Sequence, residues 1–459
     1  MLLGLKVFNL PILTKLFIWS IVLEPLLFFI IIEVNLIGMG GHIARFLQVI
    51  VLACLGLKFL VFRSKMSLPN PFNKKFRAIW LYVFFVLFST IVSLLFFNIY
   101  SFDYSLIISI RPYLEIIILF YTIFYYVYLP QYFLINSNSI NYFFEILIKV
   151  FLFSLLIGIL DLALQFFSPG FDLIPRHLLD NVDVGVRFHG LFGEPRDAFG
   201  ALALLLAVMY LKDYCTGEIK KRRFFILLIA TMGIFTFSFS SLLAIIFSIT
   251  LIFIYYFFRL ETRGKIKSIG VIVAVSTVLV ISATKSDRLF RYLEDIDDTI
   301  IQLTNGIFID SIYSSQRQDI LPVWARVNDL RNLNLTPLLI GSGAGSSSFE
   351  SIDYAVKFNK NINESNSTNQ FNSQRLSIEV SNPKSNIIRI VYEVGIIGLL
   401  LFFNVFLSSL KYQRNYPRQI LLSMLILLGC FLAHRSYIPF IYLGLLLAVF
   451  RHKENDNFH

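Results

Sequence analysis

Apolar runs recur along the whole chain, and they limit its fold more than any other feature of the sequence. A helix of about 20 apolar residues spans the hydrocarbon core of a bilayer. No water is available inside that core, so a single run can bond all of its own backbone groups only as a helix. The pattern therefore predicts an all-α polytopic membrane protein.

We predict twelve transmembrane helices. They lie near residues 12–32, 43–62, 78–98, 107–128, 142–167, 198–214, 224–238, 241–258, 267–284, 386–410, 418–433 and 436–450. Residues 1–284 hold spans 1 to 9 and an external loop at 168–197. A large external loop, 285–385, separates spans 9 and 10, and residues 386–459 hold spans 10 to 12 and a cytoplasmic tail.

The composition agrees with this class. Of the 459 residues, 57% are hydrophobic and 15% are charged, whereas soluble chains carry about 25% charged residues. These values exclude a cytosolic enzyme and a disordered chain. Cys54, Cys215 and Cys430 fall in or beside apolar runs and imply no disulfide framework. Lys6 and Lys15 precede the first long run, which has no small-residue cleavage site after it, so we expect a retained span.

The positions of the basic residues predict the orientation. Lysine and arginine are enriched in cytoplasmic connections. With a cytoplasmic N-terminus, those connections hold Lys58, Arg63, Lys65, Lys74, Lys75, Arg77, Lys212, Lys220, Lys221, Arg222, Arg223, Arg259, Arg263, Lys265, Lys267, Lys411, Arg414, Arg418, Arg451 and Lys453. Both termini are therefore expected in the cytoplasm. The net charge of +11 is explained by this topology, and no nucleic-acid partner is expected.

The loop at 285–385 is the one sizeable element predicted outside the membrane. Residues 312–333 place apolar side chains near helical spacing and predict a helix that lies on the membrane surface. The acidic cluster Glu294–Asp298 is either a solvated face or a divalent-cation site, and 359–373 is rich in Asn and Ser and is expected to be mobile. Loops of this length usually act as lids or binding loops.

Arginines occur near the predicted external ends of spans 4, 6, 10 and 12. They are Arg111, Arg196, Arg389 and Arg435. A helix N-terminus favours an anion, and a guanidinium matches phosphate with two parallel hydrogen bonds. One interpretation is a shared site for a lipid diphosphate. The alternative is that each arginine reaches separately to phospholipid headgroups.

The segment from Arg187 to Asp197 is the densest in chemically active residues. Glu194, beside Arg196 and a helix start, could accept a proton from a sugar hydroxyl, and His189 is a second candidate base. Alternatively, Glu194 or Asp197 caps the helix and His189 only makes hydrogen bonds.

In span 10, Asn386, Arg389, Glu393 and Ile397 are expected to share one helical face. Ionisable residues within a span suggest a functional site, although Arg389 and Glu393 could simply neutralise each other. Residues 341–345, Gly-Ser-Gly-Ala-Gly, lack the context of a phosphate-binding loop and predict a turn. The sequence has no zinc-ligand spacing, and we expect neither a metal site nor a cofactor.

Four stretches resemble a known family. They are Arg187-Phe-His-Gly-Leu-Phe-Gly-Glu-Pro-Arg196; Phe237-Ser-Phe-Ser-Ser-Leu242; Arg317 to Trp324 followed by Pro337 to Gly345; and Ser385-Asn386 to Gly398. Together with the long external loop, they are similar to bacterial polysaccharide polymerases of the Wzy type, in the O-antigen polymerase and ligase superfamily.

The resemblance implies a metal-independent, GT-C-like membrane glycosyltransferase of the bacterial inner membrane. Such enzymes join oligosaccharide units carried on undecaprenyl diphosphate, at the external face, into O-antigen of lipopolysaccharide, capsule or exopolysaccharide. Membrane lipid is a further partner, and a chain-length regulator protein is another candidate. The implied substrate contacts are Arg187, Arg196, Arg317 and Arg389, to which the residue analysis adds Arg111, Arg435 and Glu393.

Two alternatives stay open at this point. Ligases of the superfamily usually carry a His-Asn pair before span 10, where this chain has Lys384-Ser385-Asn386, and this difference leaves Glu194 as the candidate base. A lipid-linked oligosaccharide flippase would also have about twelve spans. A flippase needs its basic residues deep in a central cavity, whereas here they gather at one edge of the membrane.

Overall fold

The computed structural model describes most of the predicted spans and part of the long loop. The described residues are 10–26, 30–32, 41–60, 73–96, 106–168, 187–188, 190–192, 195–217, 222–236, 238–257, 315–348, 385–411, 417–433 and 437–456, with seven single residues besides (70, 173, 294, 297, 298, 300 and 301). The predicted ninth span, 267–284, and the Asn- and Ser-rich segment, 359–373, lie outside them.

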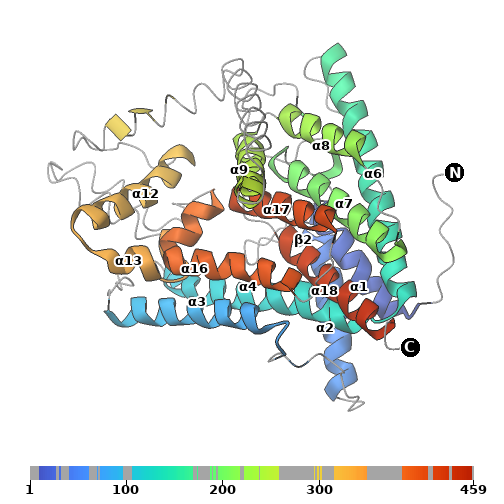
Figure 1. Ribbon diagram of the computed structural model, residues 1–459, viewed down its shortest axis with the longest axis horizontal. Coiled ribbons are helices and arrows are strands. Elements are labelled where there is room, and N and C mark those ends of the chain that lie inside the picture. The colour runs from blue at the N-terminus through green and yellow to red at the C-terminus, as the bar shows by residue number, and fades with distance from the viewer. Residues whose placement is uncertain are drawn as a thin grey trace.

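The described chain is nearly all helical (Figure 1). Its helices are α1 (Ile12–Val22), α2 (Ile43–Leu60), α3 (Arg77–Phe96), α4 (Leu106–Thr122), the π-helix η2 (Ile123–Tyr128), α5 (Leu129–Phe133), α6 (Ser137–Phe167), η3 (Gly190–Phe192), α7 (Pro195–Thr216), α8 (Arg223–Phe235), α9 (Phe239–Phe257), α12 (Ser315–Arg331), α13 (Leu335–Ile340), η4 (Ser346–Ser348), α16 (Asn386–Lys411), α17 (Arg418–Ala433) and α18 (Ile438–Asp456). Strands β1 (Ile30–Ile32) and β2 (Gly41–His42) form a short antiparallel pair.

Six of the described helical stretches are long and apolar enough to cross a membrane. They are Ile43–Leu60, Arg77–Leu95, Pro112–Phe133, Ser137–Phe167, Asp197–Thr216 and Asn386–Leu410. Shorter apolar helices cover Ile12–Val22, Phe224–Phe235, Ser241–Tyr255 and Arg418–Ala433. The predicted class, an all-α membrane protein, agrees with these helices, and the number of twelve spans stays a prediction.

The first predicted span differs from the structure. Helix α1 ends at Val22, and Ile30–Ile32 is a strand, so 12–32 is not one continuous helix. Glu24 and Pro25 form a turn after α1. The residue before a proline is disfavoured in the α region, which explains why the apolar run does not continue as a helix there.

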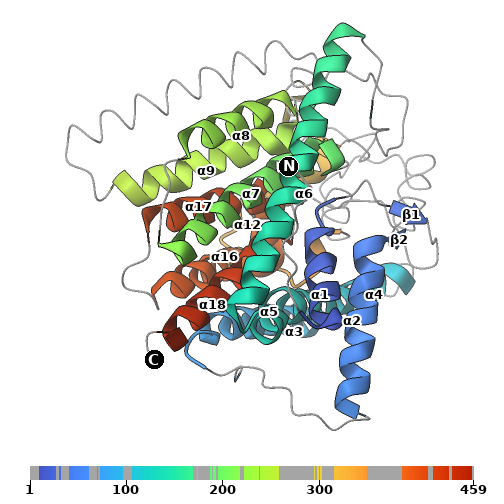
Figure 2. The same cartoon turned by 90° about the vertical axis from the view of Figure 1, so that its right-hand side faces the viewer.

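The centre of the bundle is formed by α7, α17 and α18. Every side chain of α7 from Ala198 to Leu211 is buried, and α17 packs against both α7 and α9. Helix α18 packs against α7 and against η2, while α6 runs beside α7 and α1 (Figure 2). In contrast, α2 and α3 expose large apolar side chains such as Phe46, Phe59, Phe84 and Phe88, as expected of helices that face lipid.

The predicted loop helix is confirmed in part. Helix α12 spans Ser315–Arg331, within the expected 312–333, but it packs against α13 and α16 (Figure 1). Among the side chains of α12 that the structure describes, Pro322, Ala325 and Arg326 are buried, whereas Leu330 of the predicted apolar face is exposed. A buried arginine therefore anchors this helix to the rest of the protein.

Candidate functional site

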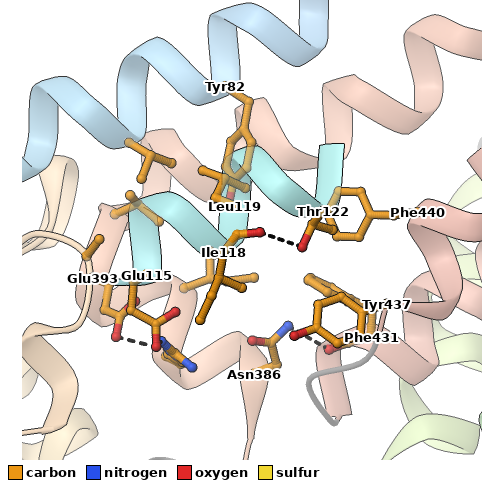
Figure 3. A pocket seen from close by; sticks show the side chains of 15 residues that line it. Tyr82, Glu115, Ile118, Leu119, Thr122, Asn386, Glu393, Phe431, Tyr437 and Phe440 are labelled. Atoms are coloured by element: carbon orange, nitrogen blue, oxygen red, sulfur yellow. Dashed lines mark hydrogen bonds and ion pairs between the residues drawn. The ribbon is translucent and has the colours of Figure 1, made fainter. Parts of the chain in front are cut away.

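A cavity of about 100 Å³ lies between α3, α4, α16 and the junction of α17 and α18. It is lined by Tyr82, Val86, Glu115, Ile118, Leu119, Thr122, Ala344, Asn386, Arg389, Ile390, Glu393, Val394, Phe431, Tyr437 and Phe440. Figure 3 shows Glu115 and Glu393 at one end, Phe431 and Tyr437 at the other, and Asn386 between them. The space is large enough for several water molecules or a polar group of a ligand.

The charged end is built around Arg389. Its Nη2 lies 2.7 Å from Oε1 of Glu115, and its Nε donates to Oε1 of Glu393 at 3.1 Å. The hydroxyl of Ser347 donates to the same Glu393 oxygen at 2.6 Å. All four side chains are largely enclosed, so these contacts are stronger than at a protein surface.

Local sequence explains half of this arrangement. Arg389 and Glu393 are four residues apart in α16 and therefore face the same side of the helix, as predicted. Glu115 comes from the middle of α4, one turn after Pro112, and the ion pair links it to the first turn of α16. From the sequence, Glu393 was one possible partner that neutralises Arg389. In the structure Arg389 pairs with Glu393 and also with Glu115.

The prediction that four residues of span 10 share one helical face is wrong for Ile397, the last of them. Asn386, Arg389 and Glu393 are buried, but Ile397 is 38% exposed. Gly395 has a non-helical backbone inside α16, with φ +69°. The kink at Gly395 breaks the helical repeat, so residues beyond it no longer continue the same face.

The segment from Gly341 to Gly345 closes the site from the loop side. It forms the expected turn, with positive φ at all three glycines. Its backbone bonds to α16, since Ser342 N donates to Tyr392 O at 3.0 Å and Gly343 N donates to Glu393 O at 2.8 Å. The sequence did not predict that this turn would lie against the candidate site.

The other end of the cavity is aromatic. The side-chain amide of Asn386 donates to the carbonyl of Phe431 at 2.9 Å, which fixes its position between the charged and aromatic ends. Tyr437, which lines this end, stacks on Tyr126 of η2. Aromatic faces beside hydrogen-bonding groups are suited to ligands that have apolar faces and polar edges.

A second polar cluster adjoins the cavity through Tyr437. Arg45 lies 2.6 Å from Glu24, and its guanidinium carbon is 5.0 Å from the centre of the Tyr437 ring. Gln48 donates to Glu24 at 2.7 Å and to the hydroxyl of Tyr126 at 3.1 Å. This cluster was not among the sites expected from the sequence, although Glu24 within an apolar run is the kind of ionisable residue that indicates one.

Arg187 lies in a segment that packs away from the cavity lining. Its backbone N–H donates to Oε1 of Gln165 in α6 at 2.7 Å, and Phe188 N donates to Phe235 O at 2.9 Å. A Cβ on Gly158 would come within 2.6 Å of the Phe188 ring, so this glycine lets the segment pack closely against α6. The first family-like stretch is thus hydrogen-bonded to the end of α8, two residues before the second stretch begins.

The other predicted residues lie wholly or partly outside the described part of the chain. Glu194, His189 and Arg435 are outside it entirely. Arg111 belongs to the second turn of α4, and Arg196 and Arg317 belong to the first turns of α7 and α12; nothing is described of their side chains. The predicted convergence of arginines on one diphosphate therefore stays a prediction.

The described cavity offers one guanidinium, two carboxylates, an amide and aromatic rings. Carboxylates and amides accept or donate hydrogen bonds to hydroxyls, and a carboxylate can accept a proton. Within the described ranges, no three His, Cys, Asp or Glu side chains are placed to hold a metal ion. The chemistry that the lining supports directly is hydrogen bonding to hydroxyl groups and proton transfer.

No family model and no curated protein matches this sequence.

Proposed function

We propose that this protein is a membrane glycosyltransferase that polymerises undecaprenyl-diphosphate-linked oligosaccharide units at the external face of the bacterial inner membrane. One observation carries the proposal. Two stretches that resemble the polymerases, 337–345 and 385–398, are distant in sequence but line the same cavity through Ala344, Asn386, Arg389 and Glu393. Residues that a reaction requires must meet at one place, and these do.

In the proposed reaction, a hydroxyl of the incoming lipid-linked unit attacks the anomeric carbon of the growing chain. The bond from that carbon to the diphosphate oxygen breaks, and undecaprenyl diphosphate leaves. Glu194, or failing it His189, takes the hydroxyl proton, a contribution of typically about 10²–10⁴ in rate. Arg187, Arg196 and Arg317 stabilise the charge that develops on the leaving diphosphate.

The cavity around Arg389 is better suited to sugar than to diphosphate. Its lining carries two carboxylates and one guanidinium. The carboxylates of Glu115 and Glu393 would repel an additional anion such as a diphosphate. Sugar hydroxyls, in contrast, find acceptors on the carboxylates and a partner in Asn386. In this proposal one end of the repeat unit enters the cavity and the remaining sugars lie outside.

The test is the glycan profile of a strain that lacks this chain, complemented with variants. Glu194→Gln, Arg196→Ala and Glu115→Gln should leave membrane insertion intact, yet single lipid-linked units should accumulate in place of a polymer ladder. Glu145→Gln is the matched control, because Glu145 pairs with Lys149 on α6 at 2.7 Å and does not line the cavity. A normal ladder from Glu194→Gln and Arg196→Ala would refute the proposal.

The same strain separates the alternatives. A ligase would leave finished polymer on its lipid carrier, without transfer to an acceptor. A flippase would leave single units on the cytoplasmic leaflet, where an externally added glycosidase cannot reach them. Single units exposed on the external leaflet support polymerisation.

A further inference from the structure

Arg326 is a buried arginine in α12 whose two Nη atoms contact three different groups. Its Nη1 lies 2.7 Å from Asp329, and its Nη2 donates to the hydroxyl of Ser342 at 2.5 Å and to the carbonyl of Tyr392 at 2.7 Å. Its guanidinium carbon lies 4.0 Å from the centre of the Tyr392 ring. The residue is 7% exposed, so one side chain joins α12, the glycine turn and α16.

These contacts converge on the kink of α16. At a kink, helical carbonyls lose their usual partners along the chain. The carbonyl of Tyr392 accepts from Arg326 and from Ser342 N, and the carbonyl of Glu393 accepts from Gly343 N and from the hydroxyl of Ser89. The turn and Arg326 therefore supply hydrogen-bond donors to two of the carbonyls that precede the kink, those of Tyr392 and Glu393.

The same turn reaches the cavity. Ala344 lines it, and its N–H donates to the hydroxyl of Thr90 in α3 at 3.0 Å. Ser347, a few residues later, donates to the carboxylate of Glu393. The position of the Glu393 side chain thus depends on the turn from two sides, through its own backbone carbonyl and through Ser347.

We infer that Arg326 is a positioning residue for the cavity: by clamping the glycine turn into the kink of α16, it fixes Glu393 and Arg389 in place. This inference rests on the proposed function only for the identity of the substrate that binds in the cavity. Arg326 itself is absent from the cavity lining and touches none of the groups placed there to meet substrate. Its effect is transmitted through Ser342 and Tyr392.

The chemistry of the side chain explains why an arginine fits this position. A guanidinium is planar, so it can stack on the Tyr392 ring while its edge donates to several acceptors. A lysine keeps the charge but supplies a point donor without the planar fork. Arg326→Lys should therefore rescue only part of the function lost in Arg326→Met.

The kinetic test uses purified protein and lipid-linked repeat units extracted from a strain lacking this chain. Arg326→Met should lower kcat by up to about 100-fold, because small displacements of aligned groups are costly, while KM changes less than about twofold. Arg331→Met is the matched control: Arg331 is on the same helix, is exposed and lies over Trp324 rather than the turn. The Arg331→Met variant should keep the kcat and the KM of the unaltered protein.

A second measurement does not depend on any enzymatic activity. Ala344→Cys is introduced into a chain whose Cys54, Cys215 and Cys430 are replaced, and a water-soluble methanethiosulfonate reagent labels it. Ala344 is buried, and loss of the Arg326 clamp should raise the labelling rate about tenfold through local opening. Ser342→Ala, which removes one bond of the clamp and retains the fold, should raise it less.

The outcomes separate the two proposals. Unchanged labelling in both Arg326→Met and Ser342→Ala, or an equal effect of Arg331→Met, would overturn the positioning role. If labelling rises as expected while the unmodified protein forms no polymer, the clamp stands and the proposed function fails. If kcat falls in Arg331→Met as far as it does in Arg326→Met, the cause is general damage to α12, and this result would also overturn the inference.

Discussion

Gly341 and Gly395 let two backbones meet at the candidate site more closely than any side chain would allow. A Cβ on Gly341 would lie 2.3 Å from the carbonyl oxygen of Glu393, and one on Gly395 would lie 2.3 Å from that of Leu339. Both residues also have positive φ, at +85° and +69°. The backbones of the turn and of the kinked helix are therefore packed so closely that neither position has room for a Cβ atom.

We predict that Gly341→Ala destabilises the protein by at least about 2 kcal/mol, because it adds both backbone strain and a clash. Gly56→Ala is the control: Gly56 lies within α2 with no atom near its Cβ position, so this change should stabilise by about 0.5–1 kcal/mol. Thermal unfolding in detergent measures both. A melting temperature of Gly341→Ala equal to that of the unaltered protein would contradict the fit described above.

The sequence predicted the position of Arg389 on its helix but not the partners of its side chain. The sequence indicated that Arg389 and Glu393 share a face, because helical spacing is a local property. It left open whether the arginine binds substrate or balances a charge. Glu115 arrives from another helix, and its ion pair with Arg389 depends on packing that spacing does not determine.

At the scale of elements, α18 extends beyond its predicted end. The expected span stops at residue 450, followed by a tail, but the helix continues to Asp456. Arg451 donates to the carbonyl of Gln131 at 2.9 Å, Lys453 to that of Tyr214 at 2.6 Å, and Glu454 pairs with Lys75. The last turns of α18 thus tie together three other parts of the chain.

Truncation after Phe450 should therefore lower stability by roughly 2–3 kcal/mol, since each of these polar contacts contributes about 1 kcal/mol. Truncation after Asp456 keeps the three contacts and should have little effect. Thermal unfolding of the two truncated forms makes the comparison. Equal melting temperatures would mean that residues 451–456 behave as the free tail that the sequence suggested.

At the scale of the whole molecule, the distribution of charge predicts the topology. We predict that green fluorescent protein fused after His459 fluoresces, and that alkaline phosphatase fused after Lys360 is active. The basis is the concentration of lysine and arginine in connections assigned to the cytoplasm. Fluorescence requires folding in the cytoplasm and phosphatase activity requires export, so the reverse pattern would invert the orientation and remove the external site.

The sequence by itself determined the class of this protein and the approximate positions of most of its described helices. Apolar length and helical spacing are local properties, and a bilayer forces a long apolar run to satisfy its own backbone. Only the tertiary structure decided which polar groups meet: Glu115 with Arg389, the glycine turn with the kink of α16, and Arg326 with Tyr392. Such contacts join residues that are far apart in the chain, and they depend on how side chains fill the space between helices, which no local pattern specifies.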